Sequence, residues 1–365
     1  MLQAGLQEEA RIAPQEAWAG HGAPIVGARG LDQVYRPWLR PLRPARSLSV
    51  GVGPEQHLGF DPAYGKIPRM TTTPLPDVTT HHDVPFTKVP EFTDFSPSPD
   101  EGVSKYTAQI PRDVALEALL LNKHSDVLLV ALHGATMRHK ELPRFEFFRT
   151  LRATPYSSLY FSDPALYLDP EIQLAWYTGW PEFDLHPVIA DWAGRAAAAI
   201  GASRVIFFGS SGGGLAALQA STFLPASMAV PFSAQTSVAN YLVAGTGLGA
   251  QRSYIRAIMP HLTPADGLGA LRPDVDYFTS VGDRLSPLLR YQQKQENYVL
   301  FVQNANDHAH FNQHYLPFRA AVEDGPNADR IKFEIQEDRP GHNPPRQEFL
   351  KDALGKAIAW SRTLT

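Results

Sequence analysis

The sequence predicts an α/β protein with a mostly parallel sheet that is covered by helices on both faces. From about residue 106 onward, strand-like apolar runs alternate with helix-like segments, which is the pattern of such a sheet. Residues 126–132 form a continuous apolar run, which is typical of a strand buried on both faces. Residues 205–218 read as a strand, a glycine-flanked serine and a small-residue helix with no spacer between them.

Each further element follows from its local pattern. The spacing of apolar residues over 113–122 predicts a helix, and residues 158–161 predict a short strand. The segment 187–200 predicts a helix with proline at its start, where the missing N–H costs nothing. The remaining expected strands are 205–208, 227–232, 298–303 and 331–336, and the remaining expected helices are 212–220 and 346–361.

Composition changes along the chain and predicts two parts. Residues 1–105 are rich in proline and glycine with short β-prone runs, and we expect them to form an irregular, β-leaning N-terminal appendage. Residues 106–365 form the main α/β domain. Within it, the stretch at about 236–297 has mixed helical and loop signals and lies where a cap insertion could cover an active site.

The overall composition is that of a globular protein with weakly charged partners. The 365 residues are 44% hydrophobic, which is enough for one large domain with an appendage. There are 33 Lys and Arg against 37 Asp and Glu, a net charge of −4, and no dense basic cluster. We therefore expect no nucleic-acid partner and favour a small-molecule or weakly charged partner. The oligomeric state is left open.

Cysteine usage and apolar runs limit the chemistry and the location. The chain has no cysteine, which excludes disulfides, thiolate metal sites and a cysteine nucleophile. No stretch reaches the roughly 18 apolar residues of a membrane span, so none is expected. The first 13 residues lack the apolar core of a signal peptide, which predicts a cytoplasmic protein.

The serine turn is the strongest functional signal. A serine hydroxyl is a weak nucleophile, so it needs a sharp strand-to-helix turn with very small residues two positions before and after it. Gly209 and Gly213 occupy these positions around Ser211, whereas a frame centred on Ser210 would require Phe208 to be small. We therefore expect Ser211 to be the nucleophile, and the N–H of Gly212 to donate to an oxyanion at the helix start.

Two other interpretations of this turn stay open. A glycine-rich turn between strand and helix also binds phosphates, and Gly209, Gly212 and Gly214 could form a variant dinucleotide site. Such a site needs an acidic residue at the end of the next strand, and residues 227–234 contain none. The second alternative is a turn without catalytic function.

An acid and a base follow the serine in the expected order. Asp307 comes directly after the strand at 298–303, and His342 follows the last strand in a glycine-containing loop. His342 would take the serine proton, and Asp307 would orient the imidazole and stabilise its charged form. Asp283 and the acids at 337 and 338 are alternatives for the orienting role.

The second oxyanion donor is expected on a loop after an earlier strand. His133 and Gly134 follow the strand at 126–132, so the backbone N–H of Gly134 or Ala135 is a candidate. The alternative is an ordinary turn glycine.

A metal or cofactor is not expected. Asp307, His308, His310 and His314 are close in sequence and could converge on an ion. Their spacing matches no metal motif, and the serine chemistry explains the same loop.

Over residues 106–365 the chain resembles the α/β-hydrolase superfamily. The resemblance rests on His133 and Gly134, the Gly-x-Ser-x-Gly pattern at 209–213, Asp307 and His342. It implies the α/β-hydrolase fold and a serine hydrolase that cleaves an ester or related acyl bond through an acyl-enzyme, with a Ser–Asp–His triad.

A second, narrower resemblance concerns the central part of the chain. Residues 161–169, Trp176 with Tyr177, and residues 207–214 look like a hydrolase-like group of proteins from capsular and surface polysaccharide biosynthesis. This resemblance implies a small-molecule or glycan substrate that carries an acyl group, and it implies two alternatives to a hydrolase. One is an O-acyltransferase acting on a polysaccharide, and the other is a non-catalytic protein of polysaccharide assembly or binding that retains the fold.

Overall fold

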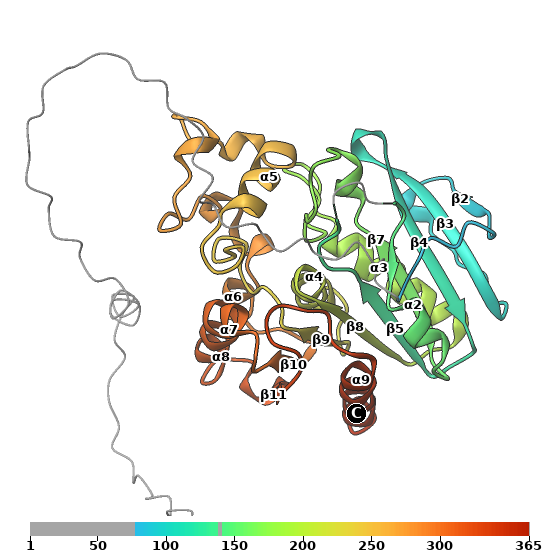
Figure 1. Cartoon of the computed structure of the whole chain (residues 1–365). Helices are drawn as coiled ribbons and strands as arrows, with labels where there is room; N and C mark the ends of the chain where they lie inside the picture. The colour runs from blue at the N-terminus through green and yellow to red at the C-terminus, as the bar shows by residue number, and fades with distance from the viewer. Residues whose placement is uncertain (1–76, 138–140, 365) are drawn as a thin grey trace, which may run out of the picture. The chain divides into compact units, whose positions relative to one another are not determined.

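A nine-stranded sheet organises the described part of the chain (Figure 1). The computed structural model describes residues 77–137 and 141–364. The chain divides into two compact units, 1–69 and 70–365, and all described residues belong to the second. Most of the expected N-terminal appendage, residues 1–76, lies outside the described residues.

The strand order across the sheet is β11-β10-β9-β8-β5-β7-β4-β3-β2. From β7 to β11 every neighbouring pair is parallel, whereas β4 is antiparallel to both β3 and β7. The strands are β2 (Phe86–Val89), β3 (Gly102–Ile110), β4 (Val114–Asn122), β5 (Val127–Leu132), β7 (Ser157–Ser162), β8 (Arg204–Ser210), β9 (Met228–Phe232), β10 (Tyr298–Asn304) and β11 (Ile331–Gln336). A separate two-stranded sheet pairs β1 (Val78–Thr79) with β6 (Phe145–Glu146).

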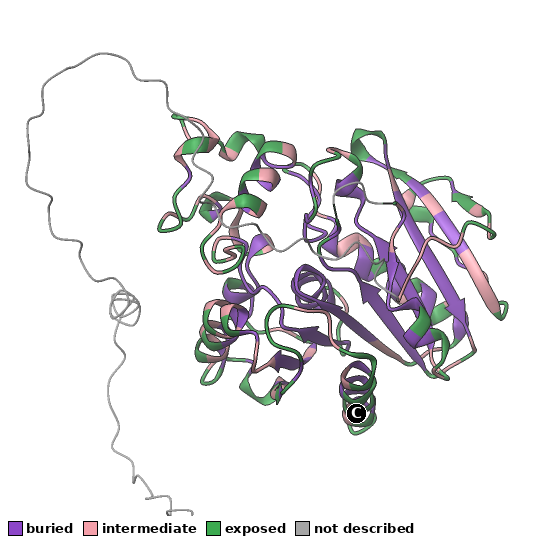
Figure 2. Ribbon diagram, viewed as in Figure 1, coloured by how far each residue is buried: buried purple, intermediate pink, exposed green. Residues whose placement is uncertain are grey.

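The central strand β5 explains why the sheet has helices on both faces. Its even-numbered residues, Leu128 to Leu132, belong to the same apolar cluster as α3 (His186–Ile200). Its odd-numbered residues, Val127 to Ala131, belong to the cluster that includes α9 (Gln347–Ser361). Successive side chains of a strand point to opposite faces, so an uninterrupted apolar run serves both cores. Figure 2 shows the central strands buried.

The other helices are short and follow the strands. They are α2 (Phe148–Arg152), α4 (Gly212–Ser221), α5 (Gly249–Ala257), α6 (Pro287–Arg290), α7 (His308–His310) and α8 (Leu316–Val322). The predicted strands at 126–132, 158–161, 205–208, 227–232, 298–303 and 331–336 and the predicted helices at 187–200, 212–220 and 346–361 are all confirmed, with small shifts of their ends. The mostly parallel, helix-covered sheet is thereby confirmed as well.

The predicted helix over 113–122 is wrong, because this segment is strand β4. It pairs along its length with β3 and also with β7, and seven of its residues in a row, 116–122, are buried. Leu120 belongs to the apolar cluster on one face of the sheet and its neighbours Leu119 and Leu121 to the cluster on the other face, so both faces are buried and the alternation that would reveal a strand is hidden. Tertiary pairing therefore overrides the local spacing.

Residues 77–105 contribute to the main unit. β2 and β3 extend the central sheet at one edge, and the expected boundary at 105/106 falls inside β3.

Residues 236–297 connect β9 to β10 through α5, α6 and short 3-10 turns. On α5, the ring of Tyr254 packs edge-on against Trp176, with 5.2 Å between the centroids, and its hydroxyl lies 2.7 Å from Thr178 Oγ1. The insertion is thus fastened to the segment that follows β7. A role as a cap over the active site stays a prediction.

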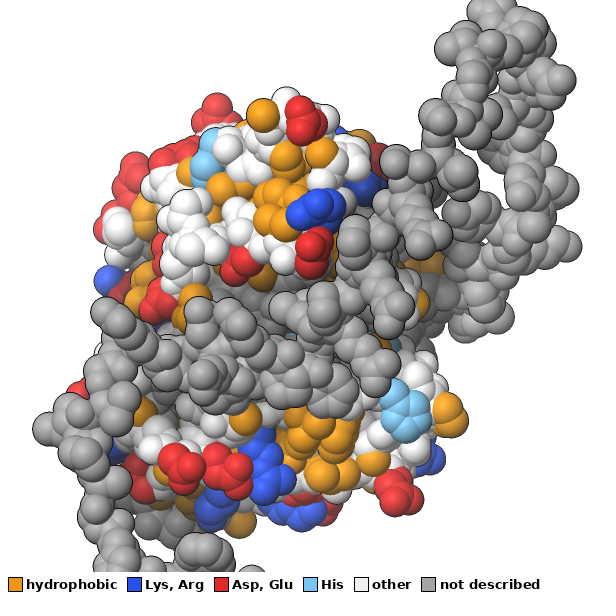
Figure 3. Space-filling view, turned by 90° about the vertical axis from the view of Figure 1, so that its left-hand side faces the viewer, with side chains coloured by type: hydrophobic (Ala, Val, Ile, Leu, Met, Phe, Trp, Pro, Cys, Tyr) orange, Lys and Arg blue, Asp and Glu red, His pale blue; other side chains and the backbone are white. Residues whose placement is uncertain are grey.

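The described surface carries mixed charge. On the face in Figure 3, acidic and basic side chains lie interspersed around small groups of apolar side chains. No described helix combines the length and the apolar character needed to cross a bilayer.

Candidate active site

Ser211 lies at the junction of β8 and α4, in a strained conformation. Its φ of 58° and ψ of −119° are rare for a residue with a side chain. Such a backbone costs about 1–3 kcal/mol and persists only where the surroundings enforce it. The side chain of Ser211 is nearly buried, with the residue 6% exposed. This geometry is that of a sharp strand-to-helix turn.

The flanking glycines allow the turn to pack tightly. A Cβ on Gly213 would lie 2.1 Å from the carbonyl oxygen of Leu132, and one on Gly209 would lie 2.5 Å from the same oxygen. Real Cβ atoms do not approach that closely, so the start of α4 can rest on β5 and β8 only if both residues are glycine. This contact explains why the sequence has glycine on each side of Ser211.

Asp307 and His342 are brought together by the loops after β10 and β11. The Nδ1 atom of His342 lies 2.6 Å from Oδ2 of Asp307. Two hydrogen bonds tie the loops to each other: Asn306 Nδ2 donates to the carbonyl of Asp338, and the Gly341 N–H donates to the carbonyl of Asn306. The parallel neighbours β10 and β11 thus place an acid and a histidine at one edge of the sheet.

A second histidine, His310, shares the same carboxylate. Its Nδ1 lies 3.3 Å from Oδ1 of Asp307. Its ring stacks on His342, with 3.7 Å between the centroids and 6° between the planes. The side chain of His310 is 5% exposed and that of His342 is 31% exposed. Asp307 therefore receives hydrogen bonds from one buried and one accessible imidazole.

Gln235 connects this pair to the serine. Its Nε2 lies 2.9 Å from Ser211 Oγ and 2.7 Å from Nε2 of His310. Its Oε1 accepts from Nε1 of Trp176 at 3.2 Å. Among the described residues, the hydrogen-bond partner of Ser211 Oγ is thus Gln235 and not His342. Catalytic hydrogen bonds are often long or poorly aligned in the absence of substrate, so this arrangement does not exclude His342 as the base.

Burial and hydrogen bonds determine the protonation states of Asp307 and His310. Burial raises the pKa of Asp307, but the hydrogen bonds from His310 and His342 outweigh burial and hold the pKa well below its usual range. Burial lowers the pKa of His310, and Asp307 offsets only part of that effect. At neutral pH the carboxylate is ionised and His310 is uncharged.

The backbone N–H groups that are predicted to stabilise the oxyanion differ in their hydrogen-bond partners. Gly212 begins α4, so its N–H has no intrahelical partner. The N–H of Gly134 donates to Oε2 of the buried Glu146 at 2.9 Å. The N–H of Ala135 has no hydrogen-bond partner among the described residues. Of the two candidates on this loop, Ala135 is the one whose N–H is available to a ligand.

His133 holds the loop that carries these donors. Its Nε2 accepts from the Asp163 N–H at 3.0 Å, and its backbone N–H donates to the Tyr177 hydroxyl at 2.9 Å. Burial, aided by Arg144, lowers the pKa of His133 to about 3. The His133 ring is therefore neutral, since the Asp163 N–H requires an unprotonated Nε2 as its acceptor.

A metal ion has poor geometry at this site. Asp307, His310 and His342 have ligand atoms within 4.8 Å of one another. The lone pairs of an imidazole lie in its ring plane, and the two rings are parallel and stacked, so their lone pairs do not converge on one ion. His308 is exposed, and His314 accepts from the Thr236 N–H through Nδ1. The four residues considered in the sequence thus do not form one ligand set.

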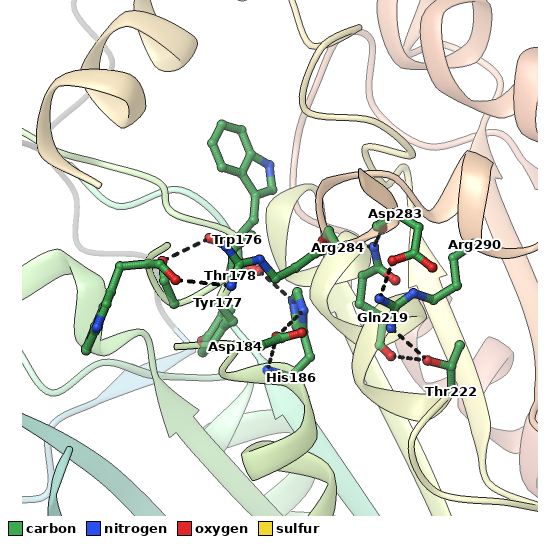
Figure 4. A network of polar contacts seen from close by, with 12 residues as sticks. Trp176, Tyr177, Thr178, Asp184, His186, Gln219, Thr222, Asp283, Arg284 and Arg290 are labelled. Carbon is green, nitrogen blue, oxygen red and sulfur yellow. Dashed lines mark hydrogen bonds and ion pairs between the residues drawn. The ribbon is translucent and has the colours of Figure 1, made fainter. Parts of the chain in front are cut away.

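Two buried polar side chains fasten other segments to the helices that pack on the sheet (Figure 4). His186, at the start of α3, donates through Nε2 to the carbonyl of Trp176 at 3.2 Å. On the neighbouring helix α4, Gln219 donates to the carbonyls of Asp283 and Arg284. His186 thus holds the segment that contains Trp176, whereas Gln219 holds the insertion and makes no hydrogen bond to the predicted triad.

Two of the three alternative acids, Asp283 and Asp338, have other partners. Asp283 pairs with Arg290 at 2.8 Å, and Asp338 pairs with Arg346 and caps neighbouring backbone N–H groups. Asp307 is the acid that contacts His342. Sequence reasoning missed Gln235 altogether, and it assigned His310 only to a discounted metal cluster. The sequence carries no local signal for Gln235.

Known structures share the fold. Puromycin hydrolase, solved as a mutant in complex with PGG, has a TM-score of 0.50 at 14% identity, over 74% of this chain and 40% of that one. Prolyl oligopeptidase B from Galerina marginata has a TM-score of 0.47 at 15% identity, over 70% and 36%. Acylaminoacyl peptidase from Pyrococcus horikoshii has a TM-score of 0.46 at 14% identity, over 70% and 40%. No family model and no curated protein matches the sequence.

These comparisons concern the fold. The described unit has the α/β-hydrolase fold, as the sequence resemblance implied, and it spans less than half the length of the structures it matches. The comparisons lend no support to the narrower resemblance, to proteins of polysaccharide biosynthesis.

Proposed function

We propose that the chain is a serine hydrolase that cleaves a carboxylic ester or related acyl bond, amides included. One observation carries this proposal. The strained Ser211, presented between β8 and α4, lies two hydrogen bonds from the histidine that stacks on the Asp307–His342 pair. Chain order, the glycine packing and the fold support the same assignment. The extension to amides is suggested by the peptidases among the structural neighbours.

In the first half-reaction, Ser211 Oγ forms a bond to the acyl carbon, and its proton passes to Nε2 of His342. The Nδ1–H of His342 donates to Asp307, which leaves Nε2 unprotonated and able to accept. The carbonyl oxygen takes the negative charge and is stabilised by the N–H groups of Gly212 and Ala135. The carbon–leaving-group bond breaks as His342 returns the proton to the leaving group.

In the second half-reaction, water replaces the leaving group. His342 takes a proton from the water, whose oxygen bonds to the acyl carbon, and the same N–H groups stabilise the second oxyanion. The bond between the acyl carbon and Ser211 Oγ then breaks as His342 protonates Oγ, and the acid is released.

The test is labelling of the purified chain with a fluorophosphonate, which phosphonylates activated serines. We expect the wild type to be labelled and both Ser211→Ala and His342→Ala to stay unlabelled while folded. Release of p-nitrophenol from p-nitrophenyl acetate and of p-nitroaniline from acyl p-nitroanilides would then compare ester with amide cleavage. A folded wild type that resists labelling, or labelling that survives Ser211→Ala, would contradict the proposal.

A further inference from the structure

We propose that Gln235 is a further catalytic residue of this site, whose amide donates to Ser211 Oγ and directs the hydroxyl proton toward His342. His310 is the positioning residue that fixes this amide. The inference rests on the proposed function of Ser211 and concerns the state of the site before substrate binds.

The orientation of the Gln235 amide follows from its partners. An indole nitrogen only donates, so the atom facing Trp176 Nε1 must be the carbonyl oxygen Oε1. The amide nitrogen Nε2 therefore faces Ser211 and His310. Gln235 is fully buried, and both hydrogens of its Nε2 have an acceptor. The side chain has one satisfied orientation.

The same bonds fix the tautomer of His310. Nε2 of His310 faces an N–H donor, so this nitrogen must be unprotonated and accept. The ring hydrogen is then on Nδ1 and points to Oδ1 of Asp307. Burial keeps the pKa of His310 below its usual value, consistent with a neutral ring. A continuous chain of donors runs from Gln235 through His310 to Asp307.

These hydrogen bonds limit where the hydroxyl hydrogen of Ser211 can point. Because Oγ accepts from Gln235, the hydroxyl hydrogen must be donated to another acceptor. His310 cannot be that acceptor, since its Nε2 is already engaged. In the proposed mechanism this acceptor is Nε2 of His342. Both hydrogens of the Gln235 amide are used, so this amide is not an oxyanion donor in this arrangement.

Trp176 holds the other end of the amide rigidly. Trp176 and Tyr177 both have left-handed backbones, with φ of 54° and 55°, which only a well-packed environment maintains. His186 donates to the Trp176 carbonyl, as Figure 4 shows. A strained, buried turn that serves to aim an indole N–H at one amide is consistent with a positioning role.

The experiment compares Gln235→Leu with a matched control, Gln219→Leu. Gln219 is equally buried and its Nε2 also donates twice, but to the carbonyls of Asp283 and Arg284. For Gln235→Leu we expect fluorophosphonate labelling and kcat on p-nitrophenyl acetate to fall about 10- to 100-fold, with a smaller change in KM. For Gln219→Leu we expect wild-type labelling and kcat.

Two further readouts separate this role from a structural one. Gln235→Glu keeps the shape of the side chain but offers no N–H donor at neutral pH, so we expect the same slow labelling in a variant that circular dichroism shows to be folded. In 15N NMR of labelled histidines, wild-type His310 should be neutral with its proton on Nδ1. In Gln235→Leu, this single tautomer should be lost.

The outcomes distinguish the two proposals. If the wild type is not labelled, or Ser211→Ala still is, the serine hydrolase itself is wrong and this inference falls with it. If Ser211 is labelled in the wild type but Gln235→Leu and Gln235→Glu react at the wild-type rate, the hydrolase stands and the role of Gln235 is overturned. A proton on Nε2 of His310 would overturn it as well.

Discussion

The short helix α7 and the loop after β11 each bring a histidine to Asp307, and the two histidines differ in what surrounds them. His310 on α7 is nearly buried, and both of its ring nitrogens have partners, Asp307 and Gln235. His342 is about a third exposed, and its one described side-chain hydrogen bond is to Asp307. The same carboxylate therefore serves an engaged imidazole and an available one.

The difference teaches which histidine can move protons. A general base must exchange a proton with the nucleophile and the leaving group, so one of its nitrogens must be free. Burial penalises the imidazolium of His310 and lowers its pKa, which favours a fixed neutral ring. Sharing one carboxylate thus does not make the two histidines equivalent.

The largest expected effect comes from removing His342, the histidine with a free ring nitrogen. His342→Ala should lower kcat on an ester substrate by about 10⁵-fold or more, as expected for loss of a triad base. His310→Phe keeps the ring that stacks on His342 and should cost only about 10-fold, the value of a lost positioning bond. Steady-state kinetics on both variants measures the ratio. Equal losses, or a larger loss in His310→Phe, would reverse our assignment of the base.

Asp307→Asn should lower kcat by about 10⁴-fold, since an amide no longer orients the imidazole or stabilises its charged form. Because both histidines lose their shared carboxylate, adding His310→Phe to Asp307→Asn should cost little more. The double-mutant cycle measures this coupling. Additive losses would mean that His310 acts on Ser211 independently of Asp307.

The comparison also includes a third histidine, His133, which is completely buried. The folded pKa of His133 is about 3 against 6.5 for the unfolded chain, so the unfolded state binds more protons between these values. His133 thus makes stability fall as pH drops below 6.5, by about 2 kcal/mol at pH 5. Urea unfolding at pH 7 and pH 5 should show this loss in the wild type. In His133→Asn the loss should be smaller by about this amount, because His310 and His314 contribute equally to both proteins, and an equal loss in both would contradict a neutral His133.

The smallest effect is expected for His308, which is exposed next to Asp307 in sequence. His308→Ala should leave kcat unchanged and alter the free energy of unfolding by less than about 0.5 kcal/mol. The measurement is the same kinetic and urea series. A marked loss in either measurement would show that the exposed start of α7 serves the site in addition to His310.

The sequence predicts those parts of the site that local pattern determines. The glycines around Ser211, and the positions of Asp307 and His342 after successive strands, are readable because chain order and turn geometry constrain them. Gln235 follows β9 with no motif, and its role arises from contacts with Trp176 and His310, which are distant in sequence. No local rule predicts such a contact.

The same limit explains the failure at β4. Its side chains pack into the apolar clusters on both faces of the sheet, so burial is nearly uniform along the strand and the alternation is lost. By contrast, β5 and β8 were predicted correctly, because short apolar runs bounded by turn residues indicate strands without knowledge of their neighbours.

The order of the site along the chain has a consequence for biosynthesis. A ribosome makes β8, Ser211 and α4 well before β10 and β11, whose following loops carry Asp307 and His342. A nascent chain that has reached only β9 therefore displays the serine without its acid or base. Under the proposed mechanism, the serine gains the base that activates it only after the last strands have joined the sheet.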